Sequence, residues 1–172
     1  RSPVNAHPDE EFHIRTARYY LTHALPPALS QPDLPQYLHP LYGTSYLLSV
    51  SPQVVYALAA QFARCFEASH FVAGVRVFQV LIFLLLVLAI LRRPGADAAA
   101  SLALLLTPQL WYVFGYFNGD GFPFALACGL ALQLGDPASL SRRFLDGTGT
   151  PRRWPAAALL GIGFALLILS KR

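Results

Sequence analysis

Three observations on the sequence predict an all-α fold. The expected protein is a polytopic helical membrane protein with about four transmembrane helices. Hydrophobic residues make up 55% of the 172 positions and charged residues 13%, roughly half the charged share of a typical soluble domain. The apolar residues form long blocks, whereas a soluble helix shows an amphipathic stripe. Arginine pairs stand beside these blocks, which is typical of membrane anchors and unlike the basic stripe of a nucleic-acid-binding protein. We therefore expect the lipid bilayer as a partner and no nucleic acid.

The first 70 residues are expected to form a long external loop that contains short juxtamembrane helices. A helix is predicted from Asp9 to about Ala24, where Pro26-Pro27 would end it. Residues 26–45 are rich in proline and predict an ordered loop with short turns. Residues 45–66 are moderately apolar but interrupted, so two short helices at the membrane interface are expected there.

Residues 71–172 are expected to form the transmembrane region. Four apolar segments predict its spans, at residues 71–91, 98–117, 119–135 and 154–170. At 1.5 Å per residue the first segment reaches about 31 Å, enough to cross a hydrocarbon core of about 30 Å. The third segment is short for a span, and we expect its helix to begin within the preceding turn or to tilt against its neighbours.

The arginine pairs also predict the orientation of these spans. Connections 92–97 and 136–153 contain arginine pairs, whereas residues 118–121 contain no lysine or arginine. The positive-inside rule places the two arginine-containing connections in the cytoplasm and residues 118–121 outside. By parity residues 1–70 are also non-cytoplasmic, in a multi-pass protein of the bacterial inner membrane or an equivalent membrane. Two acidic parts of the chain, residues 7–13 and Asp120, therefore share the external side.

Residues 7–13 contain three acids and two histidines, and two interpretations of this cluster stay open. Acids in a first helical turn stabilise the helix dipole by about 0.3–1 kcal/mol each, and an Asp between two glycines is an ordinary turn residue. Alternatively, Asp9 and Glu10 lie four and three residues before His13 and share its helix face. A carboxylate at a helix N-terminus stays ionised, which suits a general base or a ligand for a hard cation.

The segment Pro8-Asp9-Glu10, followed by Phe12-His13 and the helix Ala17-Arg18-Tyr19-Tyr20, resembles the first external loop of GT-C-fold membrane glycosyltransferases. These include protein O-mannosyltransferases, aminoarabinose transferases and bacterial relatives with a Pro-Asp-Glu-x-x-His motif. Pro108-Gln109, followed by Tyr116 to Asp120, resembles their second external acid. The resemblance covers most of residues 7–135. Family members have more spans than this chain, so we expect an upstream membrane helix and a fragment that is inactive alone.

The resemblance implies transfer of a sugar from a polyprenyl-phosphate donor to an external acceptor, usually with inversion. Asp9 would then deprotonate the acceptor hydroxyl, Glu10 would support Asp9 or the metal, and Asp120 would position a divalent cation or the acceptor. The cation, Mg²⁺ or Mn²⁺, would be bound by Asp9, Asp120 and His13. We expect the Asp9 and Asp120 carboxylates to approach within roughly 10 Å, a distance that one hydrated cation can bridge. The other candidates for substrate contact are His13, Arg76, Asn118, Lys171 and Arg172.

Two alternatives remain beside this hypothesis. The cations at Arg76, Lys171 and Arg172 could bind the donor phosphate or simply extend their side chains to the membrane interface. The whole chain could also be a non-catalytic polytopic protein, a transporter or assembly subunit, whose external acidic loop binds a partner or a metal. Charges inside the spans would favour a transporter, and only Arg76 comes close to such a position.

Overall fold

The computed structural model describes residues 7, 9–48, 54–92, 103, 105–148 and 153–170, and every regular element in these residues is helical. The predicted all-α class is therefore confirmed for the part of the chain that the structure describes. The elements, in chain order, are α1 (Glu10–Tyr19), η1 (Leu34–Tyr37), η2 (Tyr46–Leu48), α2 (Val54–Ala63), η3 (Ala68–His70), α3 (Phe71–Leu91), α5 (Pro108–Gly115), α6 (Gly121–Gly135), α7 (Leu140–Leu145) and α8 (Arg153–Ser170).

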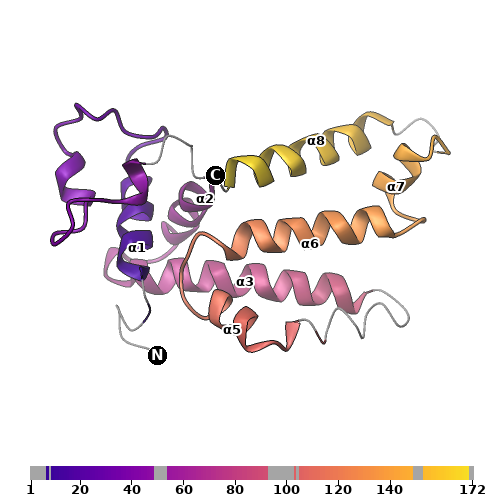
Figure 1. The fold of residues 1–172 in the computed structure, drawn as a ribbon, viewed down its shortest axis with the longest axis horizontal. Helices are drawn as coiled ribbons and strands as arrows, with labels where there is room; N and C mark the ends of the chain where they lie inside the picture. Colours follow the sequence, from indigo (N-terminus) through magenta and orange to yellow (C-terminus); the bar gives the residue numbers. More distant parts are fainter. Residues whose placement is uncertain are drawn as a thin grey trace.

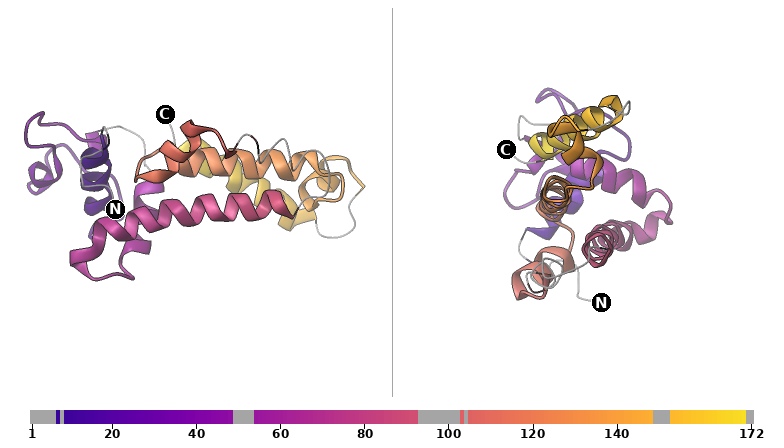
Figure 2. Two further views of the ribbon diagram at one scale, coloured as in Figure 1. Left: turned by 90° about the horizontal axis from the view of Figure 1, so that it is seen from below. Right: turned by 90° about the vertical axis from the view of Figure 1, so that its right-hand side faces the viewer.

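Three long helices, α3, α6 and α8, lie side by side along the length of the molecule (Figures 1 and 2). Helices α1 and α2 and the loop between them cover one end of this bundle, and α7 lies at the other end. The first residues of α3 and α6 and the last residues of α8 are at the α1 end. The α5–α6 turn is therefore at the same end of the molecule as residues 9–48.

Helix α1 is shorter than the sequence predicted, since it ends at Tyr19 and not near Ala24. The Tyr19 carbonyl accepts hydrogen bonds from the His23 backbone N–H at 3.2 Å and from the Thr22 hydroxyl at 3.4 Å. These contacts satisfy a carbonyl that would otherwise be unpaired at the helix end. The chain leaves the helix through a hydrogen-bonded turn at residues 20–23, before it reaches Pro26-Pro27.

The short helices predicted between residues 26 and 66 are present in the structure. The proline-rich stretch contains only the short helix η1, and two short helices, η2 and α2, follow it. Small residues bring α1, α2 and α3 close together: Ala17, Ala59 and Ala60 are fully buried. A Cβ on Gly74 of α3 would lie 3.1 Å from the Ala63 Cβ of α2, so glycine is needed for this approach.

The helices found at the predicted spans differ from one another in length. By length and composition one helix in the described ranges, Ala68–Leu91 with 24 residues, is long and apolar enough to cross a membrane. Helix α5 has 8 residues and α6 has 15, and at 1.5 Å per residue α6 is about 22 Å long. Helix α5 begins at Pro108 because proline suits the first position of a helix. Residues 98–102 of the predicted second span lie outside the described residues.

Gly121, the first residue of α6, gives a testable packing prediction. A Cβ there would lie 2.0 Å from Gln79 Nε2 and 3.1 Å from the Phe114 ring. Gln79 is fully buried on α3, and its Nε2 donates to the Val113 carbonyl at 3.1 Å. We expect Gly121→Ala to force Gln79 away from this acceptor and to destabilise the fold by about 1–3 kcal/mol.

The matched control is Gly129→Ala on the same helix, where nothing lies within 4 Å of a new Cβ. This change is expected to leave stability unchanged or to raise it by up to about 1 kcal/mol, because alanine favours helix over glycine. Thermal unfolding followed by circular dichroism compares the two variants. Equal melting temperatures would show that the Gly121 contact with Gln79 is not tight.

Candidate functional site

The two acidic parts of the chain lie against each other. The His7 ring stacks on the Tyr116 ring with centroids 4.6 Å apart and planes inclined by 8°. A Cβ on Gly119 would lie 2.8 Å from the Tyr56 hydroxyl and 3.8 Å from His13 Cε1. Residues 7–13 and the α5–α6 turn therefore form one site at the α1 end of the bundle, although more than 100 positions separate His7 from Tyr116.

Glu10 is the most buried acid of the site, with no exposed surface. Its two carboxylate oxygens accept hydrogen bonds from Arg76 Nε at 2.8 Å and Arg76 Nη2 at 2.7 Å, in a bidentate ion pair. The Phe117 backbone N–H also points to Glu10 Oε1, at 3.5 Å. Burial of a carboxylate is costly without such partners. Glu10 therefore joins α1 to α3 and to the segment that precedes Asp120.

Asp9, one residue earlier, has the opposite environment. Its side chain is exposed, and it makes no capping hydrogen bond although Asp9 occupies the N-cap position. Its backbone adopts the left-handed conformation, with φ at 63°. Non-glycine residues rarely adopt this conformation, and Asp and Asn are enriched among those that do. The structure thus directs one acid of the Asp9-Glu10 pair into the protein and the other outward.

Glu11 accounts for the third acid of the cluster. Its Oε1 accepts from Arg15 Nη2 at 2.8 Å, and its Oε2 lies 3.4 Å from His39 Nε2. Arg15 also reaches the backbone carbonyls of Gln36 and Leu38 at 3.4 Å. Glu11 therefore belongs to the contacts that hold the long loop on α1.

Asn118 shapes the turn that presents Asp120. Its Oδ1 accepts from the backbone N–H groups of Asp120 at 2.8 Å and Gly121 at 3.2 Å, and its Nδ2 donates to the Tyr116 carbonyl at 3.3 Å. The side chain is 3% exposed, so both ends of the amide are used inside the turn. The Asp120 side chain, in contrast, is exposed and forms no capping bond to α6.

Aromatic side chains form the wall between the two exposed acids. His13 Nδ1 lies 2.6 Å from the Tyr56 hydroxyl, and the His13 ring stacks on Tyr46 at 4.6 Å. His13 is 8% exposed, so it belongs to the wall of the site. Tyr46 is held in place by its neighbour Ser45, whose hydroxyl lies 3.1 Å from the Thr16 hydroxyl of α1.

The electrostatics of Tyr46 relate Asp9 to Asp120. Burial raises the pKa of the Tyr46 phenol, and the Asp9 and Asp120 carboxylates raise it further. Both acids therefore lie close enough to act on the same hydroxyl. Burial also raises the pKa of Tyr56 well above 10, with Tyr46 and Asp120 adding to the effect. This phenol stays neutral at physiological pH. The separation of the two carboxylates themselves stays a prediction.

The exposed acids fit one mode of divalent-cation binding. Within the described residues, no group of three or more His, Cys, Asp or Glu side chains could hold a metal ion. Mg²⁺, however, is often bound by one or two carboxylates together with substrate phosphates. Asp9 and Asp120 suit this mode, because both residues are exposed and both carboxylates raise the pKa of the same phenol, that of Tyr46.

The remaining predicted site residues have different outcomes. Lys171 and Arg172 lie outside the described residues. Arg76 is engaged with Glu10, and its side chain is 19% exposed. The sequence interpretation missed Tyr46 and Tyr56, because no motif or spacing distinguishes them from other tyrosines near a membrane interface. Comparisons of the chain with protein-family models, curated proteins and solved structures give no match.

Proposed function

We propose that this chain is part of a polytopic membrane glycosyltransferase that transfers a sugar from a polyprenyl-phosphate donor to an acceptor on the external side. The observation that supports it most is the convergence of two exposed acids, Asp9 and Asp120, from distant parts of the chain. The residues next to them contact α3, the helix long enough to span a bilayer: Glu10 pairs with Arg76, and Gly121 packs against Gln79. The motifs that resemble the GT-C family contain these same two acids.

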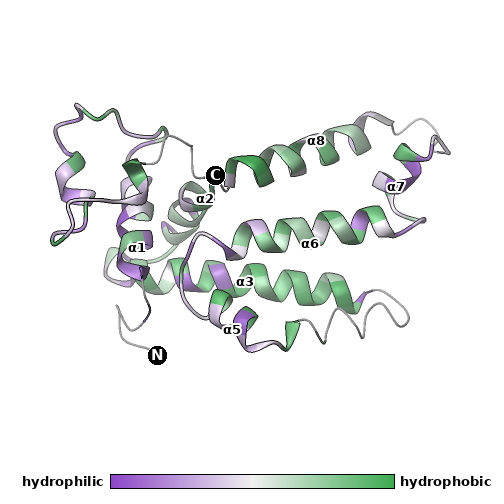
Figure 3. Ribbon diagram, viewed as in Figure 1, coloured by the Kyte–Doolittle hydropathy of each residue, from purple (hydrophilic) through white to green (hydrophobic). Residues whose placement is uncertain are grey.

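Exposed apolar side chains support the membrane part of the proposal. On α3, Leu85 is 65% exposed and Val80 54% exposed, and on α8 Ile162 and Ile168 are 61% and 64% exposed. Figure 3 shows that apolar residues dominate all three long helices along the bundle. Soluble proteins rarely expose contiguous apolar surface on this scale. Lipid or further helices of a longer protein would cover it.

The arrangement of charge supports the predicted orientation. Helix α7 contains Arg142 and Arg143 and lies at the opposite end of the bundle from α1 and the α5–α6 turn. With α7 on the cytoplasmic side, Asp9 and Asp120 are external. Helices α6 and α8 would then cross with a tilt or with local thinning of the bilayer, since both are shorter than α3.

Cys65 allows this orientation to be tested in the native chain. It is exposed, and it lies between α2 and α3 at the external end. In spheroplasts that contain the full-length protein, a membrane-impermeant maleimide is expected to label Cys65 without permeabilisation. A Cys65→Ser variant, which retains the half-buried Cys128 of α6, is the matched control. Labelling that requires permeabilisation would place residues 1–70 in the cytoplasm and contradict the orientation.

In the proposed reaction Asp9 is the general base. Its carboxylate takes the proton of the acceptor hydroxyl as the acceptor oxygen bonds to the anomeric carbon of the sugar. The bond from that carbon to the phosphate oxygen breaks, and polyprenyl phosphate leaves with the electron pair. The exposed position of Asp9 leaves its carboxylate accessible to an acceptor.

The neighbouring residues would position this base and stabilise the leaving group. A divalent cation bound by Asp9 and Asp120 would neutralise charge on the departing phosphate. Glu10 and Arg76 fix the start of α1, and Asn118 fixes the Asp120 backbone, so we assign all three a positioning role. His13 is assigned to orient Tyr56 and Tyr46. Lys171 and Arg172 remain candidates for contact with the donor phosphate.

The test is transfer from a radiolabelled polyprenyl-phosphate sugar in membranes that contain the full-length protein. Label is expected to move from the lipid fraction to an acceptor fraction, and to do so only on the external side. Absence of transfer across a panel of donor sugars, with the protein present and correctly oriented, would favour the alternative. In that alternative the acidic loop of a transporter or assembly subunit binds a partner or a metal.

A further inference from the structure

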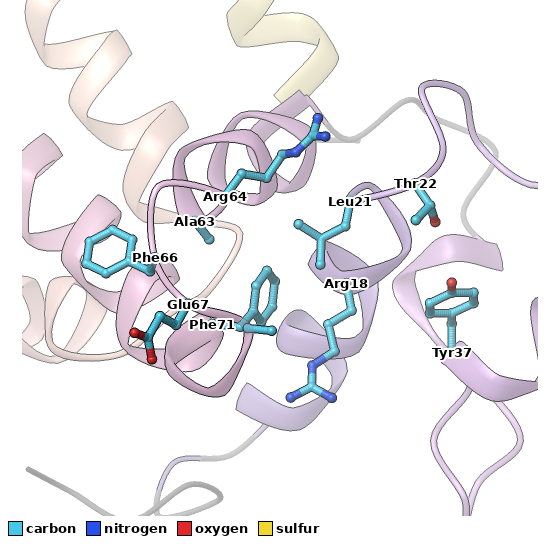
Figure 4. A pocket seen from close by; sticks show the side chains of 10 residues that line it. Arg18, Leu21, Thr22, Tyr37, Ala63, Arg64, Phe66, Glu67 and Phe71 are labelled. Carbon is cyan, nitrogen blue, oxygen red and sulfur yellow. The ribbon is translucent and has the colours of Figure 1, made fainter.

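A second hollow lies away from the two exposed acids, between the end of α1, the end of α2 and the start of α3 (Figure 4). Its volume is about 530 Å³, which is within the usual range of about 300–1,000 Å³ for small-molecule pockets. It is lined by Arg18, Leu21, Thr22, Tyr37, Ala63, Arg64, Phe66, Glu67, Ala68 and Phe71.

The hollow combines an apolar floor with a basic rim. Phe71 and Leu21 lie at its centre, and Phe66 lies beside them (Figure 4). Arg18 and Arg64 reach the rim from α1 and from the end of α2, and both are exposed. This arrangement suits a molecule with an apolar body and an anionic group, because the two parts meet different surfaces of the same hollow.

The rim arginines have weak partners in the protein itself. Arg18 lies over the Phe71 ring, 5.6 Å from its centroid, and it forms no ion pair with any described residue. Arg64 donates to the neutral Gln61 amide at 2.9 Å. The rim acid, Glu67, instead lies 3.5 Å from both Ser69 Oγ and His70 Nδ1. Both guanidinium groups are therefore available for an anion.

The position of the hollow indicates which amphipathic anion it meets. Phe71 is the first residue of α3, so a bilayer crossed by α3 has its phospholipid headgroups at this level. Aromatic and basic side chains are typical of that layer. This step rests on the membrane orientation in the proposed function. Arg18, the residue of α1 that lines the hollow, lies nine positions after Asp9, about 14 Å along the helix.

We propose that this hollow is a binding site for an anionic phospholipid of the outer leaflet. The lipid phosphate pairs with Arg18 and Arg64, and the glycerol and the first part of an acyl chain cover Phe71 and Leu21. The site anchors α1 and α2 to the bilayer surface, and thereby fixes the position of the Asp9 helix relative to the membrane.

Binding of fluorescent lipids to the detergent-solubilised full-length protein tests this site. Fluorescent phosphatidylglycerol is expected to bind more tightly than its phosphatidylcholine analogue. Arg18→Gln and Arg64→Gln are each expected to weaken phosphatidylglycerol binding about fivefold, and the double variant about twentyfold. Ala68→Trp, which fills the hollow without a change of charge, is expected to weaken binding of both lipids. Circular dichroism confirms that each variant remains folded.

Arg143→Gln is the matched control, because this exposed arginine lies on α7 at the far end of the bundle. It is expected to bind phosphatidylglycerol like the parent protein. Equal binding of the two lipids, or rim variants that behave like Arg143→Gln, would overturn the proposal. Competition by millimolar inorganic phosphate would also overturn it, and would indicate a small-anion site. Sugar transfer is measured separately, so loss of lipid selectivity with retained transfer counts against this site alone.

Discussion

Asp9→Asn in the full-length protein is expected to abolish sugar transfer while expression and membrane insertion stay normal. The substitution preserves shape but removes the proton acceptor, and loss of a general base typically costs about 10²–10⁴-fold in rate. Because the Asp9 side chain is exposed and makes no capping bond, the fold does not depend on its charge. The measurement is the rate of transfer from radiolabelled donor at equal amounts of membrane-inserted protein.

Asp33→Asn is the matched control for this experiment. Asp33 is an acid of the same external region, and its contacts are with Gln31 at 2.8 Å and His23 at 3.3 Å, within the loop. Its loss removes the same charge from the same side of the membrane, so a general electrostatic effect would appear in both variants. If Asp9→Asn retains the parental rate, Asp9 has no part in the mechanism.

Glu10→Gln is expected to have the largest effect on stability. The change leaves Arg76 without its bidentate partner in a site where Glu10 is fully buried. Removal of one partner of a buried ion pair typically costs about 3–5 kcal/mol, and the partial exposure of Arg76 favours the lower end of this range. Chemical denaturation in detergent, followed by circular dichroism, measures the free energy of unfolding.

Glu11→Gln is the control, because the side chains of Glu11 and Arg15 are both partly exposed, and such a pair contributes about 1 kcal/mol. A second variant, Glu10→Gln combined with Arg76→Gln, is expected to recover part of the loss, because no uncompensated charge remains. If Glu10→Gln and Glu11→Gln destabilise equally, the Glu10–Arg76 pair does not hold α1 on α3.

These two predictions separate neighbouring acids that look equivalent in sequence. Asp9 and Glu10 are both acids at the start of one helix, and both belong to the motif that resembles the GT-C family. The structure places Glu10 inside, on Arg76, and Asp9 outside. Two results would establish this division. Asp9→Asn would lower the transfer rate without lowering stability, and Glu10→Gln would lower stability more than the transfer rate.

Composition and periodicity were sufficient for the helical class and for the approximate positions of the helices. Long apolar blocks predicted helices near 71–91, 119–135 and 154–170, and the structure has α3, α6 and α8 there. Such blocks determine local structure, because an uninterrupted apolar run in a chain with few charges satisfies its backbone groups within a helix. The predicted end of α1 was wrong, because Thr22 and His23 form a turn with hydrogen bonds to the Tyr19 carbonyl before the chain reaches the prolines.

The sequence by itself supplied the candidate acids of the site, and its arginine distribution predicted that these acids share one side of the protein. Only the tertiary structure decided their separate environments. Arg76 lies 66 positions from Glu10, and Phe117 lies 107 positions away, so no local pattern could reveal their contacts with this carboxylate. No local pattern could reveal the positions of Tyr46 and Tyr56 in the site either. Burial and pairing depend on which helices meet, and side chains that meet through packing leave no spacing signal in the chain.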